Sequence, residues 1–388
     1  MNGFGTKLKK KKILHVVGRM HPGGIETLLM NVYRNIDRDR YEFHFAVQSA
    51  EPSFYDDEIR ALGGTIFVQP PPKKGIRSFK RELMANMKKH GPYDAVHSHV
   101  FGFSGYILKL AEELDVPVRI SHSHNTHDSK SGGLLRRMYR KYMRGLIRSH
   151  STMMLGCSRE ACESLFGEDC WHDKRVNVFP NAISLEPYAS LPEDRTELRR
   201  RLGASDDELL IGHIGRFSAQ KNHDLLLDSF AQFSRKHPQA RLLLVGDGPL
   251  RAAMEHKAKE LGVAQQVSFL GLRKDIPELL GALDGFVLPS LYEGLGIVLI
   301  EAQAAGVPCL VSDVVPSEAD LELGLVDRLT LNASPERWAE ALAVVSSGHE
   351  DETRARRRID WSLRARALGD RGYDIRGSAA KLERLYGG

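Results

Sequence analysis

The chain of 388 residues has few cysteines and no long apolar run. The cysteines, Cys157, Cys162, Cys170 and Cys309, form no Cys-x-x-Cys pair, so free thiols are expected rather than a metal or disulfide cluster. No apolar stretch approaches the length of a membrane span. The apolar segment after the basic N-terminal tract is too short for a signal peptide. We therefore expect the protein to remain in the cytosol.

The sequence also gives little indication of a metal site. The chain has one Asp-x-Asp, Asp37-Arg38-Asp39, a pattern that elsewhere holds a divalent metal beneath a nucleotide diphosphate. Here it follows a predicted helix in a polar segment, and no apolar strand leads into it. We interpret it as a solvated turn and expect neither a metal nor a cofactor.

The composition, 42% hydrophobic and 27% charged, is that of a globular protein long enough for two domains. Its charge is unevenly divided. Residues 1–180 hold 29 Lys and Arg against 19 Asp and Glu, a net +10, whereas the remainder holds 26 against 31, a net −5. The N-terminal half is therefore expected to meet something anionic.

Short apolar runs alternate with helical patterns along the whole chain. Strands are predicted at 13–17, 42–47, 65–68, 95–97, 118–122, 152–157 and 176–179, then at 209–214, 241–245, 267–270, 285–288 and 308–312. Helices are predicted near 24–36, 55–62, 77–90, 103–114 and 134–149, then near 222–236, 248–261, 276–282, 297–305 and 334–345. Such alternation predicts parallel sheets covered on both faces. The pattern restarts after residue 185, so we expect an α/β protein with two doubly wound halves and a hinge near 180–183.

The most informative segment is 290–306, which follows a predicted buried strand and carries two carboxylates eight positions apart. Glu293 precedes Gly294, Leu295 and Gly296 in a turn, and Glu301 lies one turn into the next helix. Glycines let a ligand approach the backbone, and the amides of a helix start favour a diphosphate. One carboxylate suits sugar hydroxyls and the other a ribose diol. The segment therefore indicates a nucleotide sugar site.

This segment resembles the Glu-x7-Glu motif of the retaining glycosyltransferases of family 4. The resemblance covers essentially the whole chain and implies the GT-B fold, with two Rossmann-like domains that face each other across a cleft. It implies an acceptor-side domain at 1–182, a donor-binding domain at 183–364 and a C-terminal helix, 365–388, that returns to the first domain. Residues 180–183, Pro-Asn-Ala-Ile, resemble the family's linker, with Ala182 in place of the usual glycine.

Two cations follow the first strand of the second half. Arg216 and Lys221 stand five positions apart in a strand-helix loop, where they can converge on one diphosphate and stabilise its departure. Their spacing matches the family's Arg-x4-Lys. The resemblance therefore assigns both to the donor diphosphate, in place of a metal.

Further donor contacts follow from the resemblance. Gly23 and Gly24 form a turn before a helix, which offers open amides to an oxyanion, and the family's matching glycines contact the donor diphosphate. Leu272 lies in a segment that resembles the loop holding the nucleotide base. Such a loop uses backbone groups, so it does not identify the base.

Histidines are concentrated after two neighbouring strands, at His97, His99, His122, His124 and His127. Two His-x-His pairs are also typical of metal-dependent hydrolases, which is the alternative from another class. That alternative requires one eight-stranded barrel with carboxylate or lysine ligands, and the chain shows two halves instead.

The family resemblance gives two of these histidines a role. It places His124, which Asn125 follows, beside the reacting sugar, and it makes His99 a candidate on the acceptor side. His97 and His122 are interpreted as sheet packing.

Residues 134–148 are basic and amphipathic. This pattern is typical of a helix on an anionic membrane and equally of a domain helix with a solvated basic face. Nucleic acid is not expected, because no aromatic-basic stacking platform accompanies the charge.

We therefore predict a retaining glycosyltransferase that uses a nucleoside diphosphate sugar, UDP-linked on the family's pattern. Its expected acceptor is a glycan or a lipid-linked saccharide, and its expected location is the cytosol with peripheral contact to the inner face of the membrane. Another GT-B enzyme, such as a UDP-sugar epimerase, is the alternative within the same fold.

Overall fold

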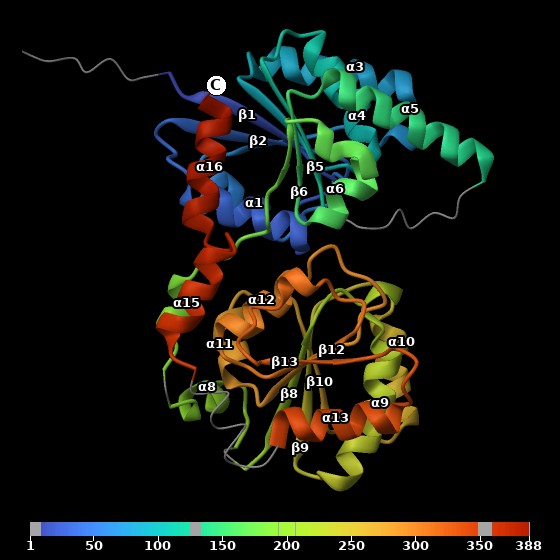
Figure 1. Ribbon diagram of the computed structural model, residues 1–388, viewed down its shortest axis with the longest axis vertical. Helices are drawn as coiled ribbons and strands as arrows, with labels where there is room; N and C mark the ends of the chain where they lie inside the picture. The colour runs from blue at the N-terminus through green and yellow to red at the C-terminus, as the bar shows by residue number, and fades with distance from the viewer. Residues whose placement is uncertain (1–8, 125–132, 193, 206, 348–358, 388) are drawn as a thin grey trace, which may run out of the picture. The chain divides into compact units, whose positions relative to one another are not determined.

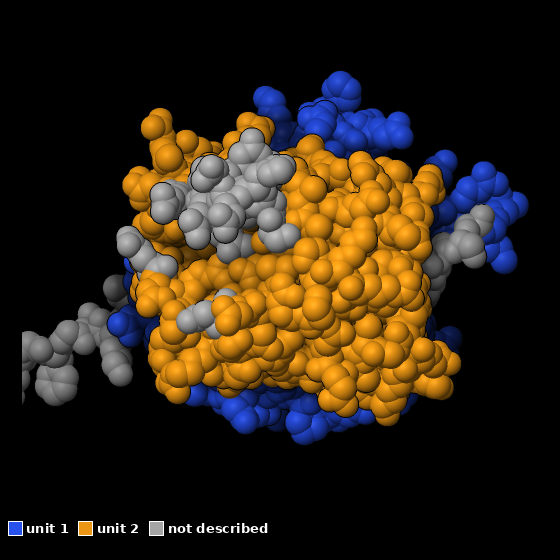
Figure 2. Space-filling model, turned by 90° about the horizontal axis from the view of Figure 1, so that it is seen from below, with its two compact units in different colours: residues 1–182, 375–388 blue, residues 183–374 orange. Residues whose placement is uncertain are grey.

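The computed structural model describes residues 9–124, 133–192, 194–205, 207–347 and 359–387. The chain forms two compact units, one of residues 1–182 with 375–388 (unit 1) and the other of residues 183–374 (unit 2), which Figure 2 shows in different colours. Each unit contains one parallel sheet with helices packed against it (Figure 1). The predicted α/β class with two Rossmann-like halves is confirmed.

The sheet of unit 1 has seven strands in the order β3-β2-β1-β4-β5-β6-β7. They are β1 (Lys11–Val16), β2 (Tyr41–Val47), β3 (Thr65–Val68), β4 (Ala95–Ser98), β5 (Val118–Ser123), β6 (Met153–Gly156) and β7 (Val176–Val178). The order reverses between β1 and β4. In an open parallel sheet, the crevice at such a switch point is the usual ligand site.

Alternate residues of these strands face two separate cores. Ile13 and Val17 pack in the core that contains residues of α1 and α16, whereas Leu14 and Val16 pack in the core that contains residues of α3 and α4. The helices of unit 1 are α1 (Gly24–Asn35), α2 (Asp56–Ala61), α3 (Ile76–His90), α4 (Ser104–Glu112), α5 (Leu134–His150), α6 (Arg159–Phe166) and α16 (Ile375–Gly387). A sheet buried on both faces explains its nearly continuous apolar strands.

The C-terminal segment, expected as one helix at 365–388, consists of two helices. α15 (Trp361–Asp370) belongs to unit 2, and α16 belongs to unit 1. Within unit 1, the Tyr41 hydroxyl donates to the Glu383 carbonyl at 2.9 Å, and the buried Tyr386 hydroxyl lies 2.8 Å from Nδ1 of His97. Helix α16 is therefore part of the core beside the histidines.

The sheet of unit 2 has six strands in the order β10-β9-β8-β11-β12-β13. They are β8 (Leu209–Ile214), β9 (Ala240–Val245), β10 (Val267–Gly271), β11 (Gly285–Leu288), β12 (Cys309–Ser312) and β13 (Val326–Leu329). The helices include α7 (Glu186–Ala189), α8 (Thr196–Arg201), α9 (His223–Lys236), α10 (Arg251–Glu260), α11 (Ile276–Ala282), α12 (Ile297–Ala304) and α13 (Pro335–Ser347). The strand order reverses between β8 and β11, so this unit also has a switch point.

Three expectations about absent features have an outcome in the structure. The four cysteines are buried and form no disulfide, and burial raises the pKa of Cys162 to about 12, which disfavours the reactive thiolate. Asp37 and Asp39 lie exposed in a turn, where the Asp39 amide donates to the Asp37 carboxylate at 3.0 Å. Among the helices that the structure describes, none has both the length and the hydropathy needed to cross a bilayer.

Candidate functional site

The predicted donor loops of unit 2 meet at its switch point. β8 pairs directly with β11, with Ile211 opposite Gly285. The loop after β8 carries Arg216 and Lys221, and the loop after β11 carries Glu293. The Leu291 amide donates to the Gln220 carbonyl at 2.8 Å, so the two loops are joined through their backbones. The structure thus brings together two segments about 70 residues apart in the sequence.

Glu293 is the centre of a polar network at this switch point. Its carboxylate accepts from Lys221 Nζ at 2.5 Å, from the Ser290 hydroxyl at 2.6 Å and from the Gln220 amide at 3.4 Å. Only 7% of Glu293 is exposed, yet three donors surround its charge. A buried carboxylate with such support has a fixed position, which is what a sugar-orienting group requires.

The turn after Glu293 leads directly into helix α12. Gly296 has φ +80, a conformation that glycine adopts without strain, and Leu295 is 3% exposed and anchors the turn in the core. Helix α12 begins at the next residue, so its first amides face the loop side. Gly294, Leu295 and Gly296 thus form the expected approach to a helix N-terminus.

Glu301 lies inside α12 and differs from Glu293 in its surroundings. Burial raises the pKa of Glu301 to about 7, and a hydrogen bond from Tyr188 acts in the opposite direction. Tyr188 belongs to α7 and is itself 4% exposed. The carboxyl group is therefore poised to change its protonation near neutral pH.

The other predicted donor residues of unit 2 lie apart from the Glu293 network. Arg216 is exposed, and it forms no salt bridge within the part of the chain that the structure describes. Leu272 is half-buried in the loop after β10, which is two strands from β8 in the sheet. Lys221 is the predicted cation that the structure places against a predicted carboxylate.

Gly246, in the glycine-rich exit of β9, has a packing role. A Cβ there would lie 2.1 Å from the Gly215 carbonyl oxygen, and its φ of +138 also requires glycine. This glycine lets the exits of β8 and β9 touch.

In unit 1, Gly23 and Gly24 lie exposed at the start of α1, in the loop after β1. Gly24 is next to the hinge, since a Cβ on it would lie 3.7 Å from the Asn181 amide nitrogen. Asn181 also acts on His124, whose pKa it raises against the effect of burial. Asn181 therefore lies close to two of the predicted site residues.

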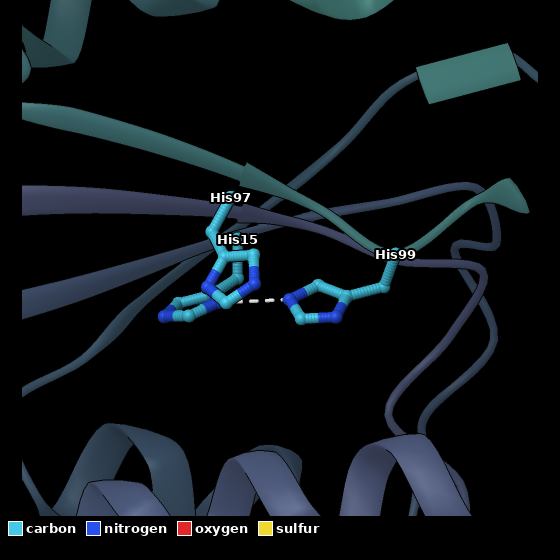
Figure 3. Close-up of side chains that lie close together, drawn as sticks. All are labelled: His15, His97 and His99. Atoms are coloured by element: carbon cyan, nitrogen blue, oxygen red, sulfur yellow. Dashed lines mark hydrogen bonds between the residues drawn. The ribbon is translucent and has the colours of Figure 1, made fainter. Parts of the chain in front are cut away.

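Five histidines share one face of the unit 1 sheet, the face covered by α1 and α16. They are His15 of β1, His97 and His99 at the end of β4, and His122 and His124 at the end of β5, and each is at most 8% exposed. Figure 3 shows the rings of His15, His97 and His99 grouped together. Their spacing of two residues along neighbouring strands places them on the same side.

These imidazoles form two hydrogen-bonded series. In the first, His15 Nδ1 lies 3.2 Å from His99 Nε2, and His99 Nδ1 lies 2.9 Å from His124 Nε2. In the second, His122 Nδ1 lies 3.1 Å from His97 Nε2, whose Nδ1 faces the Tyr386 hydroxyl.

Burial keeps these rings neutral. It lowers the pKa of His15 and of His124 to about 3, and it holds those of His97, His99 and His122 well below the usual range. At neutral pH, each ring therefore carries one proton and one lone pair.

Two sets of three histidines also satisfy the spacing of metal ligands. The nitrogens of His15, His97 and His99 lie within 4.8 Å of one another, as do those of His99, His122 and His124. Some facing nitrogens, such as those of His15 and His99, lie at hydrogen-bonding distance, so a hydrogen bond and a shared metal ion are alternative uses of the same lone pairs. The barrel that the hydrolase alternative requires is replaced by two open sheets.

Comparison with known proteins agrees with this geometry. The family description "Glycosyltransferase Family 4" matches residues 22–187, and "Glycosyl transferases group 1" matches residues 194–359. EpsF of Bacillus subtilis (strain 168), named as a glycosyltransferase, is 36% identical over 97% of this chain and 96% of its own length. The chain therefore belongs to the family 4 glycosyltransferases, and it is a sugar-transferring enzyme rather than a metal hydrolase or an epimerase.

More distant proteins share the same fold or family. The UDP-Gal:alpha-D-GlcNAc-diphosphoundecaprenol alpha-1,3-galactosyltransferase of Escherichia coli is 25% identical over 79% of this chain and 80% of its own. Anabaena HepE, solved with UDP and glucose, superposes with a TM-score of 0.76 at 19% identity, covering 97% of this chain and 99% of that one. The glycosyltransferase WaaG superposes with a TM-score of 0.73 at 19% identity, covering 97% and 100%. These structures support the GT-B fold.

Several residues of the site were not predicted. Ser290 and Gln220 border the predicted motifs and are found through their contacts with Glu293. Tyr188 and His15 carry no local signal, because only the fold brings them to Glu301 and His99. Asn125 and His127 lie outside the described residues.

Proposed function

We propose that this chain is a retaining glycosyltransferase that transfers a sugar from a nucleoside diphosphate donor, UDP-linked, to a glycan or lipid-linked saccharide. The observation that carries the proposal is the Glu293 network at the β8–β11 switch point, beside the N-terminus of α12. A fixed carboxylate, a nearby ammonium group and open amides match a sugar joined to a diphosphate. The names of the Escherichia coli relative and of the HepE structure, which mention UDP-galactose and UDP, support the base.

The proposed roles are assigned separately to residues of each unit. In unit 2, Glu293 orients the sugar, Glu301 accepts from the ribose diol, and Arg216 and Lys221 stabilise the departing diphosphate. The backbone near Leu272 meets the base. In unit 1, Gly23 and Gly24 offer amides to the diphosphate.

The remaining roles in unit 1 belong to histidines. His124 acts beside the reacting sugar, and His99, whose Nδ1 lies 2.9 Å from His124 Nε2, is the candidate on the acceptor side. The diphosphate leaves from the face that the acceptor attacks, so the cations act on the transition state. No metal is needed in this arrangement, and transfer should continue in EDTA.

The donor site is tested by thermal unfolding with a panel of nucleotide sugars. A donor at 100 times its Kd adds about 2.7 kcal/mol to the stability of the folded protein, so it raises the melting temperature visibly. The response should fall sharply in Lys221→Ala. Lys257→Ala is the matched control, because Lys257 is a half-buried lysine of α10 that also pairs with a carboxylate, that of Asp228 at 2.9 Å. The proposed donor site would be refuted if no nucleotide sugar raised the melting temperature, or if both variants responded equally.

The two glutamates should separate kinetically. Glu293→Gln should lower kcat, because Glu293 touches the reacting sugar. Glu301→Gln should mainly weaken UDP binding, because a ribose contact persists from ground state to transition state. Isothermal titration with free UDP measures the second effect alone. Equal loss of UDP affinity in both variants would contradict this division.

We also propose that the N-terminal part of α5 contacts an anionic membrane, where a lipid-linked acceptor lies. Leu134, Leu135, Met138 and Tyr142 are between 60% and 82% exposed on this helix. Figure 1 shows this end of α5 extending beyond the other helices of its unit. The C-terminal part of the helix is anchored instead, since Met143 and Ile147 are buried.

The basic residues of α5 divide in the same way. Arg136, Arg137, Arg140 and Lys141 lie among the exposed apolar side chains. Arg144 donates to the Leu165 carbonyl at 3.1 Å and so caps the end of α6. The first four residues are therefore the candidate membrane contacts, and Arg144 is structural.

A further inference from the structure

Gln69, the residue that follows β3, carries a buried side-chain amide without a partner. The residue is 1% exposed, and neither its amide nitrogen nor its carbonyl oxygen forms a hydrogen bond with any described residue. A buried polar group that is left unpaired destabilises the folded protein, so each such group calls for an explanation. A side-chain amide in this state offers two donors and an acceptor to a ligand.

Gln69 lies on the face of the unit 1 sheet that α3 covers. Phe67, two residues earlier in the chain, packs in the same core as Phe79 of α3, and residues two apart in a strand share a face. The Gln69 backbone amide donates to the Val47 carbonyl at 2.9 Å, so the parallel ladder continues to this residue. From here the chain turns into the short 3₁₀ helix η1 (Pro72–Lys74) and then into α3. The amide of Gln69 is therefore on the side of the sheet where α3 begins.

The start of α3 has the character of an anion site. Its N-cap residue, Gly75, provides no side-chain cap, and its first turn contains no acidic residue. The first amides of a helix have no partner within it, and they carry the positive end of its dipole. Lys73, Lys74 and Arg77 flank this helix start, are exposed, and form no salt bridge within the part of the chain that the structure describes. Three cations and uncapped amides favour an anionic ligand.

The exits of the neighbouring strands connect Gln69 to the switch point of unit 1. The Gln48 amide, at the end of β2, donates to the Gly18 carbonyl, at the end of β1, at 2.8 Å. Gly18 is exposed, and no described atom lies within 4 Å of a Cβ placed on it. Neighbouring strands are about 4.8 Å apart, so Gln69 lies about 10 Å from β1, which borders the switch point. A ligand seated at the switch point can therefore extend to Gln69.

We propose that Gln69, the first amides of α3 and the cations Lys73, Lys74 and Arg77 form a subsite for a phosphate group of the acceptor. This inference rests on the proposed transfer to a glycan or lipid-linked saccharide, because it identifies a part of the acceptor that unit 1 binds. The side-chain amide of Gln69 donates to a phosphate oxygen, and the helix amides and cations stabilise the charge. The acceptor is then a phosphorylated saccharide, either soluble or linked to a lipid through a diphosphate.

Titration calorimetry with inorganic diphosphate tests the subsite. Saturating UDP is present throughout, so that the donor site is occupied. Gln69→Leu, which keeps a side chain of similar size, should lower the affinity for diphosphate about 10-fold, because a hydrogen bond to a charged group is lost. The double variant Lys73→Ala/Lys74→Ala should also lower it, and the loss should be greater at low salt than at high salt.

The matched control is Lys88→Ala/Lys89→Ala. These two lysines are exposed in the last turn of α3, so the control removes the same charge from the opposite end of the helix. Its affinity for diphosphate should equal that of the wild type. An equal loss in both double variants would overturn the proposal, because it would reduce the binding to a general effect of net charge. Unchanged affinity in Gln69→Leu would also overturn it.

Thermal unfolding without a ligand separates a binding residue from a structural one. Gln69→Leu removes an unpaired buried amide, so it should raise the melting temperature of the ligand-free protein. Diphosphate should raise the melting temperature of the wild type more than that of this variant. A lower melting temperature in ligand-free Gln69→Leu would overturn the proposal, because it would show that the amide stabilises the protein itself.

Two further probes identify the source of the phosphate. Glucose 1-phosphate represents a soluble phosphorylated sugar, and farnesyl diphosphate represents a lipid-linked acceptor. Binding of either probe that is weakened in Gln69→Leu supports the subsite, and the tighter of the two assigns its source. A failure of UDP to bind would refute the proposed function, whereas a response to diphosphate that depends on Gln69 would still establish the anion site.

Discussion

We predict that the buried histidines make unit 1 more sensitive to acid than unit 2. A histidine with a lower pKa in the folded protein than in the unfolded chain takes up its proton on unfolding. Its contribution to stability is complete above pH 6.5 and is lost as the pH falls below that value. Lowering the pH from 7.5 to 5.5 should therefore destabilise the unit with more such residues.

The magnitude follows from the shifts. His15 and His124, with pKa values lowered from 6.5 to about 3, each lose about 1.4 kcal/mol over this interval, together about 3 kcal/mol. His97, His99 and His122 shift in the same direction and add to the loss. The loss is a large part of the stability of an ordinary domain, about 5–15 kcal/mol.

Unit 2 contains opposing groups. His223, lowered to about 4, loses about 1.4 kcal/mol, and His213 adds to that loss. Glu301, raised from 4.5 to about 7, instead gains a proton in the folded state, which stabilises the unit by at most about 2 kcal/mol, since its side chain keeps some solvent contact. The two effects cancel in part, so unit 2 should lose much less stability than unit 1.

Pulsed hydrogen exchange resolves the two units in the unmodified protein. Samples equilibrated in urea at pH 7.5 or 5.5 receive the same labelling pulse, and mass spectrometry then reads peptides from each unit. The urea midpoint of unit 1 should fall by several times the change in unit 2. His15→Phe should shrink the loss in unit 1 by about 1.4 kcal/mol, and exposed His172→Gln is the control. Equal losses in both units, or a larger loss in unit 2, would refute the assignment of neutral buried rings.

Three further outcomes are expected. Asp284→Asn should destabilise unit 2 by about 3–5 kcal/mol in urea unfolding, because Asp284 is buried between Arg195 at 2.9 Å and Arg199 at 3.1 Å. The control is Asp370→Asn, which breaks an exposed pair with Arg366 in the same unit and should cost under about 1 kcal/mol. Tyr188→Phe removes a hydrogen bond that lowers the pKa of Glu301. When UDP affinity is measured by titration calorimetry at a series of pH values, the pH at which it is half-lost should therefore rise from about 7. An unchanged value would refute the contact. Charge reversal of Arg136, Arg137, Arg140 and Lys141 should abolish salt-sensitive binding to anionic vesicles, because each of these residues contributes roughly 1 kcal/mol to that binding. Reversal of Arg144 alone should mainly destabilise unit 1. Vesicle binding that does not depend on lipid charge would contradict the membrane contact.

Most of the fold could be predicted because strand and helix periods differ clearly along this chain. The missed strand β13 lies at the edge of its sheet and carries Asp327 and Arg328, so it lacks an apolar run. The missed helices α7 and α8 have four and six residues, too short for a periodic pattern or for independent stability. Helix α6 was also missed, although the sequence did carry a signal for its start: Ser158 caps the helix by accepting a hydrogen bond from the Ala161 amide.

The sequence predicts which loops carry the candidate site, but it does not predict the contacts between their side chains. Local spacing marked Lys221 and Glu293 separately and gave them different partners, the diphosphate and the sugar. Their 2.5 Å pair depends on β11 crossing back to lie beside β8, which is a property of the sheet order. The same holds for Tyr188 and Glu301, which lie far apart in the sequence and are joined by a hydrogen bond only in the folded unit.

The histidines show how one arrangement can serve two purposes that experiment can separate. Leu or Phe would fill the same face of the sheet without any loss of stability in acid, so packing alone does not explain five imidazoles there. If hydrogen bonding toward His124 is the reason for the first series, Leu at position 97 should improve stability at pH 5.5 and leave kcat nearly intact. Leu at position 15 should improve acid stability by a similar amount but lower kcat. Urea unfolding and initial rates measured on the two variants distinguish these possibilities. Equal kcat values would indicate that both series serve only packing. A loss of kcat confined to the variant at position 15 would indicate that the first series, which makes unit 1 sensitive to acid, also contributes to catalysis.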